Sequence, residues 1–298
     1  MSSYAAESAS LSRLEFMMKR LISVAVVLLI EAHTASAACK AIAGADQLWS
    51  AQQIRCIFEG EVHGSNETPA AFFDLVCDAV AHGKLVTVAL ERPVTEQNTL
   101  SEVLSAHDLA RAEKALLDAP GWKAGIDGRA SKAMLQLLVS LRELHTGKAH
   151  EVAVSAFDAF EGPYNPGEPG ARDEALGRAL LKMGTDHPDR LILVLTGNLH
   201  AMQAPMNGYN LAAMYVPAEK RISLEVTDTA TGRTWSQLNQ GCGPTENGVR
   251  AKSGEKPRGI YLDPTLAPYG KVDGILELGE PLTVSTPANE DAAAECKE

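Results

Sequence analysis

The chain has 298 residues, of which 45% are hydrophobic and 22% are charged, and its formal net charge is −11. This length and composition suffice for a large globular domain and exclude a wholly disordered chain. The acidic balance argues against a general nucleic-acid binder, because such proteins need a basic face to displace the counterions of the phosphate backbone, although a local basic patch is compatible with it. We therefore expect no nucleic-acid partner. The composition does not indicate an oligomeric state.

Residues 1–37 predict an N-terminal extension followed by a secretory signal peptide. Lys19 and Arg20 form a positively charged segment, residues 21–30 are apolar, and residues 35–37 read A-S-A, a small-residue cleavage site. The apolar run is too short to span a bilayer, so we expect no integral membrane span. The alternative is a short buried helix. The order of these features predicts an exported protein, periplasmic or secreted.

The chain contains five cysteines, and export would permit them to form disulfides. Because the number is odd, at least one cysteine has no partner within the chain, and the spacing does not reveal the pairs. Their spacing does not match C-x-x-C or a zinc ribbon. Lipid anchoring through Cys39, directly after the predicted cleavage site, is an alternative, although Ser36 stands where lipoproteins usually have an aliphatic residue. The five are Cys39, Cys56, Cys77, Cys242 and Cys296.

After the predicted leader, short apolar runs alternate with helical periods, which predicts a single domain over residues 38–298 with βαβ units. The expected strands are 54–60, 84–91, 150–158, 190–197, 221–228 and 272–284. The expected helices are 68–83, with Thr68 as N-cap, then 100–118, 128–145 and 172–183. The fold class is therefore α/β, with a mostly parallel central sheet flanked by helices.

Polar residues stand where four of these strands end. In open parallel sheets, ligands bind beyond the carboxyl ends of the strands. We therefore expect two histidines and three carboxylates to gather at one rim of the sheet. They are Glu61, His63, Glu91, Asp158 and His200.

The spacing Gly-x-x-His occurs twice, at Gly60–His63 and at Gly197–His200, each time after a predicted strand. Glycine lets the chain turn sharply and brings the histidine back over the sheet edge. Two imidazoles presented in this way can bind a metal ion, or one can act as a general base. They can equally be ordinary histidines in polar loops.

Glu91 ends a nearly continuous apolar run, so its carboxylate should be partly buried and needs a partner. Arg92 is adjacent, but neighbouring strand residues point to opposite faces of a sheet. Arg172, at the start of a predicted helix, is a better candidate. Arg172 and Asp173 can equally be ordinary helix-start charges. Like Glu91, Glu61 could orient a histidine, ligate a metal or activate water.

Four motifs occur in order between residues 49 and 287: "GEVHG", "ALERP", "ARDEALGRAL" and "VLTGNLHA". Together they resemble the superfamily of erythromycin esterases, ChaN-type haem-binding lipoproteins and Tiki/TraB proteins. The resemblance implies an EreA/ChaN-like fold with a site at the rim of the sheet. The residues that match the superfamily's motif positions are Glu61, His63, Glu91, Arg172 and His200.

The branches of that superfamily imply different activities. In the esterase branch a histidine activates water for ester or lactone cleavage, in the Tiki branch the two histidines are associated with a divalent metal and peptide hydrolysis, and the ChaN branch binds haem. One residue separates Glu61 from His63, as in the ChaN and Tiki branches, whereas Gly64 is typical of the esterase branch. The motifs therefore leave the branch open.

Our first expectation is an exported hydrolase that acts on ester, lactone or peptide bonds of a small-molecule or peptide substrate, and whose catalytic residues are the five matched residues. A divalent metal ion at His63 and His200 is one version of this site. The alternative is a haem- or metal-binding periplasmic protein without turnover, in which the histidines, Tyr164 or Tyr209 would be ligands. A third reading is an interaction module whose ancestral site has decayed. Trp122, in a glycine-rich turn, is expected to anchor a loop or form part of a lid. The remaining histidines, which we expect at the surface, are His82, His107, His145, His150 and His187.

Overall fold

The computed structural model describes most of the chain after the predicted leader. The described residues are 39–125, 127–147, 151–160, 168, 170–230, 232–237, 241–252 and 254–296. The predicted signal peptide, Tyr164 and His150 lie outside them. The leader, the cleavage site and the domain boundary therefore stay predictions.

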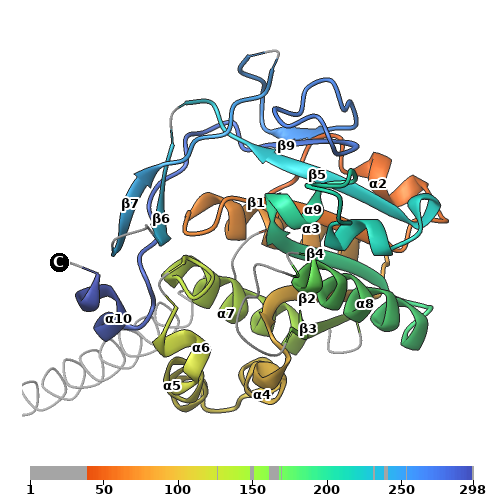
Figure 1. The fold of residues 1–298 in the computed structure, drawn as a ribbon. Helices are drawn as coiled ribbons and strands as arrows, with labels where there is room; N and C mark the ends of the chain where they lie inside the picture. Colours follow the sequence, from red (N-terminus) through yellow and green to blue (C-terminus); the bar gives the residue numbers. More distant parts are fainter. Residues whose placement is uncertain are drawn as a thin grey trace, which may run out of the picture. The chain divides into compact units, whose positions relative to one another are not determined.

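A seven-stranded sheet lies at the centre of the described fold, with the strand order β3-β2-β4-β1-β5-β9-β8 (Figure 1). Every neighbouring pair in this sheet is parallel except β8 and β9. The strands are β1 (Cys56–Glu61), β2 (Val86–Pro93), β3 (Val152–Asp158), β4 (Leu191–Gly197), β5 (Arg221–Thr227), β8 (Gly259–Tyr261) and β9 (Gly274–Glu277). The predicted α/β class with a mostly parallel sheet is confirmed.

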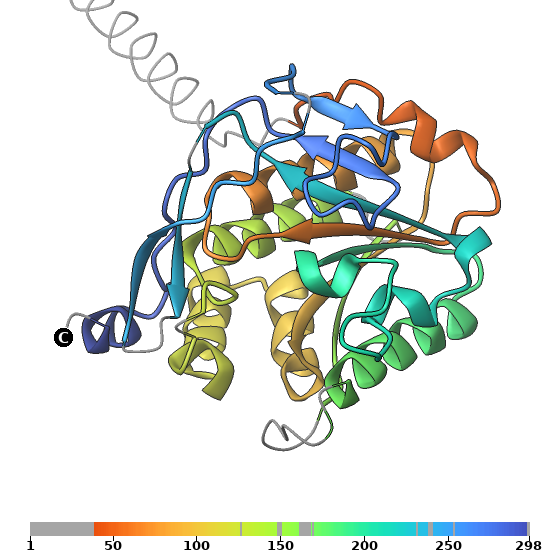
Figure 2. The same ribbon diagram turned by 45° about the horizontal axis from the view of Figure 1, so that its top comes forward.

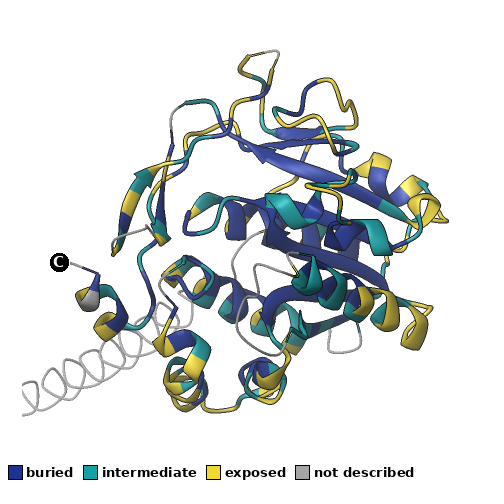
Figure 3. Ribbon diagram, viewed as in Figure 1, coloured by how far each residue is buried: buried dark blue, intermediate teal, exposed yellow. Residues whose placement is uncertain are grey.

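The central strands form because their residues can be buried on both faces. All seven residues of β4 and all six of β1 are buried. Such strands appear in the sequence as continuous apolar runs rather than alternating ones. Figure 3 shows the strands as the buried centre, with exposed residues on the outer faces of the helices.

Helices cover both faces of the sheet (Figure 2). On one face, Leu176 and Leu180 of α8 pack with Phe58, Phe157 and Val194 of the strands. The helices are α2 (Asp46–Ser50), α3 (Glu67–Ala81), α4 (Gln97–Ser105), α5 (Leu109–Asp118), α6 (Pro120–Lys123), α7 (Lys132–Gly147), α8 (Ala171–Asp186), α9 (Asn198–Ala201) and α10 (Glu290–Glu295), with 3₁₀ turns at Val94–Glu96, Ala212–Tyr215 and Ala218–Lys220. None of the helices in the described ranges is long and apolar enough to cross a membrane.

The helix predicted over residues 100–118 is wrong, because the structure has two helices there. The chain is extended at Ala106, whose carbonyl oxygen accepts a hydrogen bond from Arg142 Nε at 3.0 Å. Asp108 then caps α5 by accepting a hydrogen bond from the backbone nitrogen of Arg111 at 3.1 Å. A local cap and a contact from another helix thus interrupt a pattern that was periodic in sequence.

The start of α3 also differs from the prediction. Asn66, not Thr68, stands at the N-cap position, and the helix begins at Glu67. Thr68 is buried in the first turn, where its hydroxyl accepts a hydrogen bond from Ser65 Oγ at 2.8 Å. The helix ends at Ala81, two residues before Gly83, whose φ of +72° is the left-handed conformation expected after a helix.

A separate two-stranded antiparallel sheet, absent from the sequence prediction, consists of β6 (Arg233–Gln237) and β7 (Cys242–Glu246). Figure 1 shows this hairpin beside α10. The disulfide Cys242–Cys296 joins the first residue of β7 to the residue after α10. This hairpin forms one wall of a cavity.

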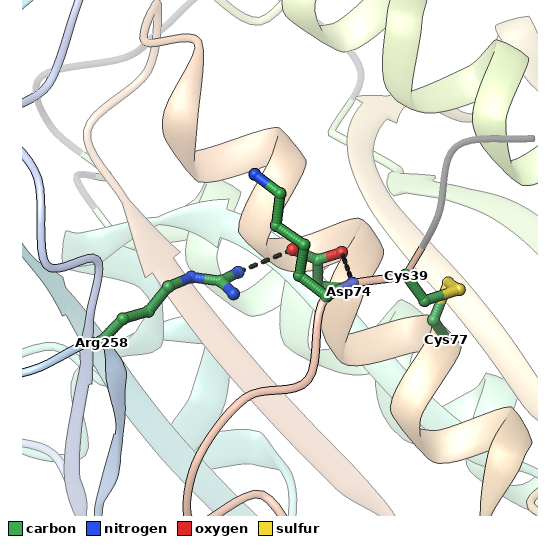
Figure 4. The surroundings of a disulfide bond; sticks show 5 residues. Cys39, Asp74, Cys77 and Arg258 are labelled. Carbon is green, nitrogen blue, oxygen red and sulfur yellow. Dashed lines mark hydrogen bonds and ion pairs between the residues drawn. A yellow bond between two sulfur atoms is a disulfide. The ribbon is translucent and has the colours of Figure 1, made fainter. Parts of the chain in front are cut away.

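The second disulfide, Cys39–Cys77, ties the start of the described chain to α3 (Figure 4). Beside it, Asp74 accepts hydrogen bonds from the backbone nitrogen of Lys40 at 2.8 Å and from Arg258 at 2.7 Å. A sulfur atom in a disulfide cannot also carry a lipid. The structure therefore argues against lipid anchoring through Cys39.

The remaining cysteine, Cys56, is free and buried. Burial raises the pKa of its thiol above the usual range. The prediction that at least one cysteine stays unpaired is confirmed. Two disulfides are consistent with export to an oxidising compartment.

Candidate functional site

The carboxyl ends of β1, β2, β3 and β4 lie side by side because these strands are parallel neighbours. Glu61, Asp158 and Gly197 are the last residues of β1, β3 and β4. Glu91 lies at an irregularity between β2 and β3, where the register shifts between Leu90 and Pro93. Such irregularities re-aim side chains at the end of a strand. The side chain of Glu91 is only 4% exposed and is the centre of the site.

Glu91 is held by four hydrogen bonds. Its Oε2 atom accepts from the Thr196 hydroxyl at 2.6 Å and from the Gly197 backbone nitrogen at 2.8 Å. Its Oε1 atom accepts from Arg172 at 2.6 Å and from Arg129 at 3.0 Å. The predicted partnership between Glu91 and Arg172 is therefore present. The buried carboxylate is fixed in position and satisfied.

The charges around Glu91 keep it ionised. Burial alone would raise the pKa of a carboxyl group, but the imidazoles of His200 and His63 and the two guanidinium groups outweigh it. They hold the pKa of Glu91 well below its usual range. Glu91 is therefore unsuited to taking a proton during a reaction near neutral pH.

Arg172, in the first turn of α8, connects three of the site residues. Its Nη2 atom donates to Glu91 and to Asp158, the latter at 2.7 Å, and its Nε atom donates to Asp158 at 3.2 Å. Its Nη1 atom donates to Nε2 of His200 at 2.9 Å. Most N–H groups of the guanidinium are therefore occupied within the network and are not available to bind an anion.

His200, on α9, is oriented by Asp173. The Oδ1 atom of Asp173 lies 2.7 Å from Nδ1 of His200 and also accepts a hydrogen bond from the backbone nitrogen of Ala212 at 3.0 Å. Because a carboxylate accepts, Nδ1 carries the proton, and Nε2 is left to accept from Arg172. Asp173 is therefore more than a helix-start charge, although that was one reading of the sequence.

His63 forms the second histidine–carboxylate pair. Its Nδ1 atom lies 2.8 Å from Oε1 of Glu61, and its Nε2 atom lies 3.9 Å from Oε2 of Glu91. In the part of the chain that the structure describes, Nε2 has no hydrogen-bond partner. Burial opposes protonation of the imidazole, but the carboxylates of Glu61 and Glu91 outweigh it and raise the pKa of His63. His63 is thus an oriented imidazole with a free Nε2 atom.

Backbone packing at two glycines places His63. Gly64 and Gly128 have φ values of +82° and +90°, which favour glycine. A Cβ atom on Gly128 would lie 2.5 Å from the backbone nitrogen of Gly64, and one on Gly64 would overlap the backbone of Trp235. The Gly64 carbonyl oxygen accepts a hydrogen bond from the Trp235 nitrogen at 2.9 Å. Three distant segments therefore meet directly after His63.

Arg129 and Asp127, which the strand-end rule does not predict, enter the site from the loop before α7. Arg129 donates to Glu91 and, through Nε at 2.9 Å, to Asp127. These residues do not follow a strand, so the strand-end rule could not find them. The clue in the sequence is the segment Gly125–Arg129, in which charged residues flank a glycine.

A cavity of about 580 Å³ opens over the two histidines. Its size is in the range of small-molecule sites. The main sheet and α9 contribute one side of it, and the β6–β7 hairpin contributes another. Residues from these two sides include His63, Asn198, His200, Ser236 and Asn247, and Tyr269 lines the cavity from the loop between β8 and β9. A larger hollow of about 800 Å³ between β3 and α8 has none of the network residues in its lining.

The structure thus brings together all five residues that match the superfamily's motif positions, Glu61, His63, Glu91, Arg172 and His200, and Asp158, which is also expected at the rim. It adds Arg129, Asp127, Asp173 and Thr196. Tyr209, half-buried, does not line the cavity. Arg92 pairs with Glu96 rather than with Glu91, as the strand geometry predicts. Trp122 is fully buried, with Arg92 4.9 Å from its ring, and is a loop anchor rather than a lid.

The remaining histidines lie outside this network where the structure describes them. His82, His107 and His187 are exposed. His145 is half-buried, with its Nδ1 atom 2.9 Å from the carbonyl oxygen of Val152. For these four, the expectation that they are not site residues agrees with their positions.

The expected metal site does not fit this arrangement. No group of three or more His, Cys, Asp or Glu side chains in the described ranges is placed to hold a metal ion. The Nε2 atom of His200 accepts a hydrogen bond from Arg172, so its lone pair is taken, and a guanidinium at that point repels a cation. Haem fits no better, because carboxylates line the cavity and haem itself carries anionic propionates.

No family model matches the chain, and no curated protein matches it in sequence. Solved structures do match. An erythromycin esterase, a mutant of EreC in an open conformation, is 11% identical over 79% of this chain and 93% of its own, with a TM-score of 0.58. A protein of Bacillus cereus is 10% identical over 82% of this chain and 94% of its own, with a TM-score of 0.55. A succinoglycan biosynthesis protein is 9% identical over 81% and 91%, with a TM-score of 0.53.

The described residues define an α/β protein with a buried histidine, carboxylate and arginine network at the carboxyl edge of a mostly parallel sheet. Its fold is that of the erythromycin esterase-like structures, as the four sequence motifs predict. At these identities the likeness establishes the fold and leaves the activity to be argued from the site.

Proposed function

We propose that the protein is an exported hydrolase that cleaves an ester or lactone bond, with His63 as the general base. The supporting observation is the geometry of His63: Glu61 holds Nδ1 at 2.8 Å, and Nε2 is left free beside Glu91 and the cavity. The fold shared with an erythromycin esterase favours an ester or lactone over a peptide bond. The disulfides and the predicted signal peptide support export.

In this mechanism, Nε2 of His63 accepts a proton from a water molecule as the water attacks the substrate carbonyl carbon. Glu61 accepts the Nδ1 hydrogen bond and stabilises the imidazolium that forms. Glu91, which stays ionised, adds to that stabilisation through its 3.9 Å approach to Nε2. The proton passes afterwards to the leaving oxygen.

The negative charge that develops on the carbonyl oxygen needs a positive neighbour. We assign this role to Arg172. One N–H of its Nη1 group donates to His200, and the other N–H has no acceptor among the described residues. A donor fixed by Glu91 and Asp158 before the reaction stabilises an oxyanion without reorganising. His200 and Asp173 position this donor from the other side.

The test is hydrolysis of a panel of 4-nitrophenyl esters and lactones by the purified mature protein. His63→Ala should lower kcat by about 10²- to 10⁴-fold, the usual contribution of a general base, with an unchanged circular dichroism spectrum. His82→Ala is the matched control, because His82 is exposed at the end of α3. Retention of the wild-type kcat by His63→Ala would contradict the proposal.

A further inference from the structure

We infer that the substrate carries a positive charge, as an ammonium or guanidinium group. This inference rests on the proposed function, since it concerns the same cavity, but it predicts a property that hydrolysis alone does not require. Three features of the described residues carry it: the charge of the network, the charge of the cavity wall, and an exposed aromatic ring.

The network beneath the cavity has an excess of negative charge. Five carboxylates face two guanidinium groups, which leaves a formal charge of −3 when both imidazoles are neutral. The carboxylates are Glu61, Glu91, Asp127, Asp158 and Asp173, and the guanidinium groups are Arg129 and Arg172. Protonation of both histidines would still leave −1. The site therefore attracts cations and repels anionic substrates such as carboxylates and phosphate esters.

The wall of the cavity has the same sign. Its described lining includes Glu61, Asp127 and Glu246 but neither lysine nor arginine. Glu246, the last residue of β7, is exposed and forms no ion pair with any described residue. Arg233 is its cross-strand neighbour, yet the two side chains form no ion pair. A carboxylate on a cavity wall without a partner is available to a cationic ligand.

The exposed ring belongs to Tyr269. This residue lines the cavity and is 52% exposed, the largest value among the exposed large hydrophobic side chains of the described residues. Its backbone nitrogen donates to Glu225 of β5 at 3.4 Å, which ties its loop to the sheet. Aromatic rings attract ammonium and guanidinium groups through their quadrupole. An aromatic face and a free carboxylate on the same cavity favour a cationic substrate over a neutral one.

The experiment compares acetylcholine with 3,3-dimethylbutyl acetate, in which carbon replaces the charged nitrogen. Binding of both esters to the His63→Ala protein is measured by calorimetry, and hydrolysis of both by the wild type. We expect acetylcholine to bind at least about fivefold more tightly, a modest value because Tyr269 and Glu246 are exposed. The ratio should fall as salt is raised from 0.01 to about 0.5 M, because salt screens exposed charges.

Two substitutions locate the preference. Glu246→Gln and Tyr269→Leu should each lower the ratio of the two affinities. Glu102→Gln is the matched control, because Glu102 is exposed on α4 and does not line the cavity. A ratio that none of these substitutions changes would place the preference in the buried network, which also supports the inference.

The outcomes separate the inference from the proposed function. Preferential binding of acetylcholine without hydrolysis of either ester would support the inference and contradict the hydrolase. Hydrolysis of both esters with equal affinity would support the hydrolase and overturn the inference. Tighter binding of the neutral ester, or no binding of either at millimolar concentration, would also overturn it.

Discussion

Oδ1 of Asp173 on α8 lies 2.7 Å from Nδ1 of His200 on α9, and this contact fixes which nitrogen of the imidazole carries a proton. With Asp173 ionised, Nδ1 of His200 is the donor and Nε2 accepts from Arg172. Asp173→Asn can reverse this order, because the asparagine amide can donate to Nδ1. The proton on Nε2 would then face the donor Nη1 of Arg172.

We expect Asp173→Asn to lower kcat by about tenfold or more, because misplacing Arg172 weakens a preorganised oxyanion donor. The tautomer can be read from the ¹⁵N chemical shifts of His200. Glu174→Gln is the matched control, since Glu174 is the next residue on α8 and its ion pair among the described residues is with the exposed Arg178. An unchanged kcat in Asp173→Asn would show that the orientation of His200 does not matter.

Gly128→Ala should destabilise the protein more than Gly83→Ala. Both glycines have positive φ, so both substitutions cost about 1–2 kcal/mol of backbone strain. A Cβ atom on Gly83 meets open space, whereas one on Gly128 would press on the backbone at Gly64. Urea denaturation measures the difference. Equal losses of unfolding free energy in the two variants would mean that this close backbone approach is not needed.

Removal of the Cys242–Cys296 disulfide should raise KM more than it lowers kcat. The disulfide anchors the β6–β7 hairpin, which carries cavity residues but none of the network around Glu91. A double cysteine-to-serine variant of this pair is compared with the same change at Cys39 and Cys77, which lie away from the cavity. We expect several-fold higher KM in the first variant only. Similar kinetics in both variants would contradict a role for the hairpin in binding.

The sheet and half of the site could be predicted from sequence because they obey local rules. Each buried parallel strand is a continuous apolar run, and the polar residue at its end lies at the shared rim. This rule predicts Glu61, His63, Glu91, Asp158 and His200. The prediction of Arg172 rests on two arguments: the buried carboxylate of Glu91 needs a positively charged partner, and Arg172 matches a motif position of the superfamily.

The other half of the site depends on contacts that no local rule encodes. Arg129, paired with Asp127, reaches Glu91 because Gly128 packs against Gly64, and that contact joins segments more than sixty residues apart in the chain. The local sequence around Asp173 is the same whether its carboxylate merely interacts with the helix dipole or orients His200. The break between α4 and α5 likewise depends on Arg142 from α7.

The hairpin of β6 and β7 was missed for a similar reason. Its strands are short and only partly buried, with Trp235 and Thr234 as the buried residues of β6. Such segments lack the apolar run of the central strands. Their position is set by the disulfide to Cys296 and by the hydrogen bond from Trp235 to Gly64. Neither partner can be read from spacing.

The central claim is that His63 acts as the base under the control of Glu61, and the pH dependence of kcat/KM in Glu61→Gln tests it most directly. The Glu61 carboxylate raises the pKa of His63, and the base works only when neutral, so activity should rise with pH through that pKa. Glutamine keeps an oxygen that can accept the Nδ1 hydrogen bond but removes the charge. We predict that the acidic limb of the Glu61→Gln profile moves to lower pH, with a lower plateau. An acidic limb that stays in place, or moves to higher pH, would contradict the account.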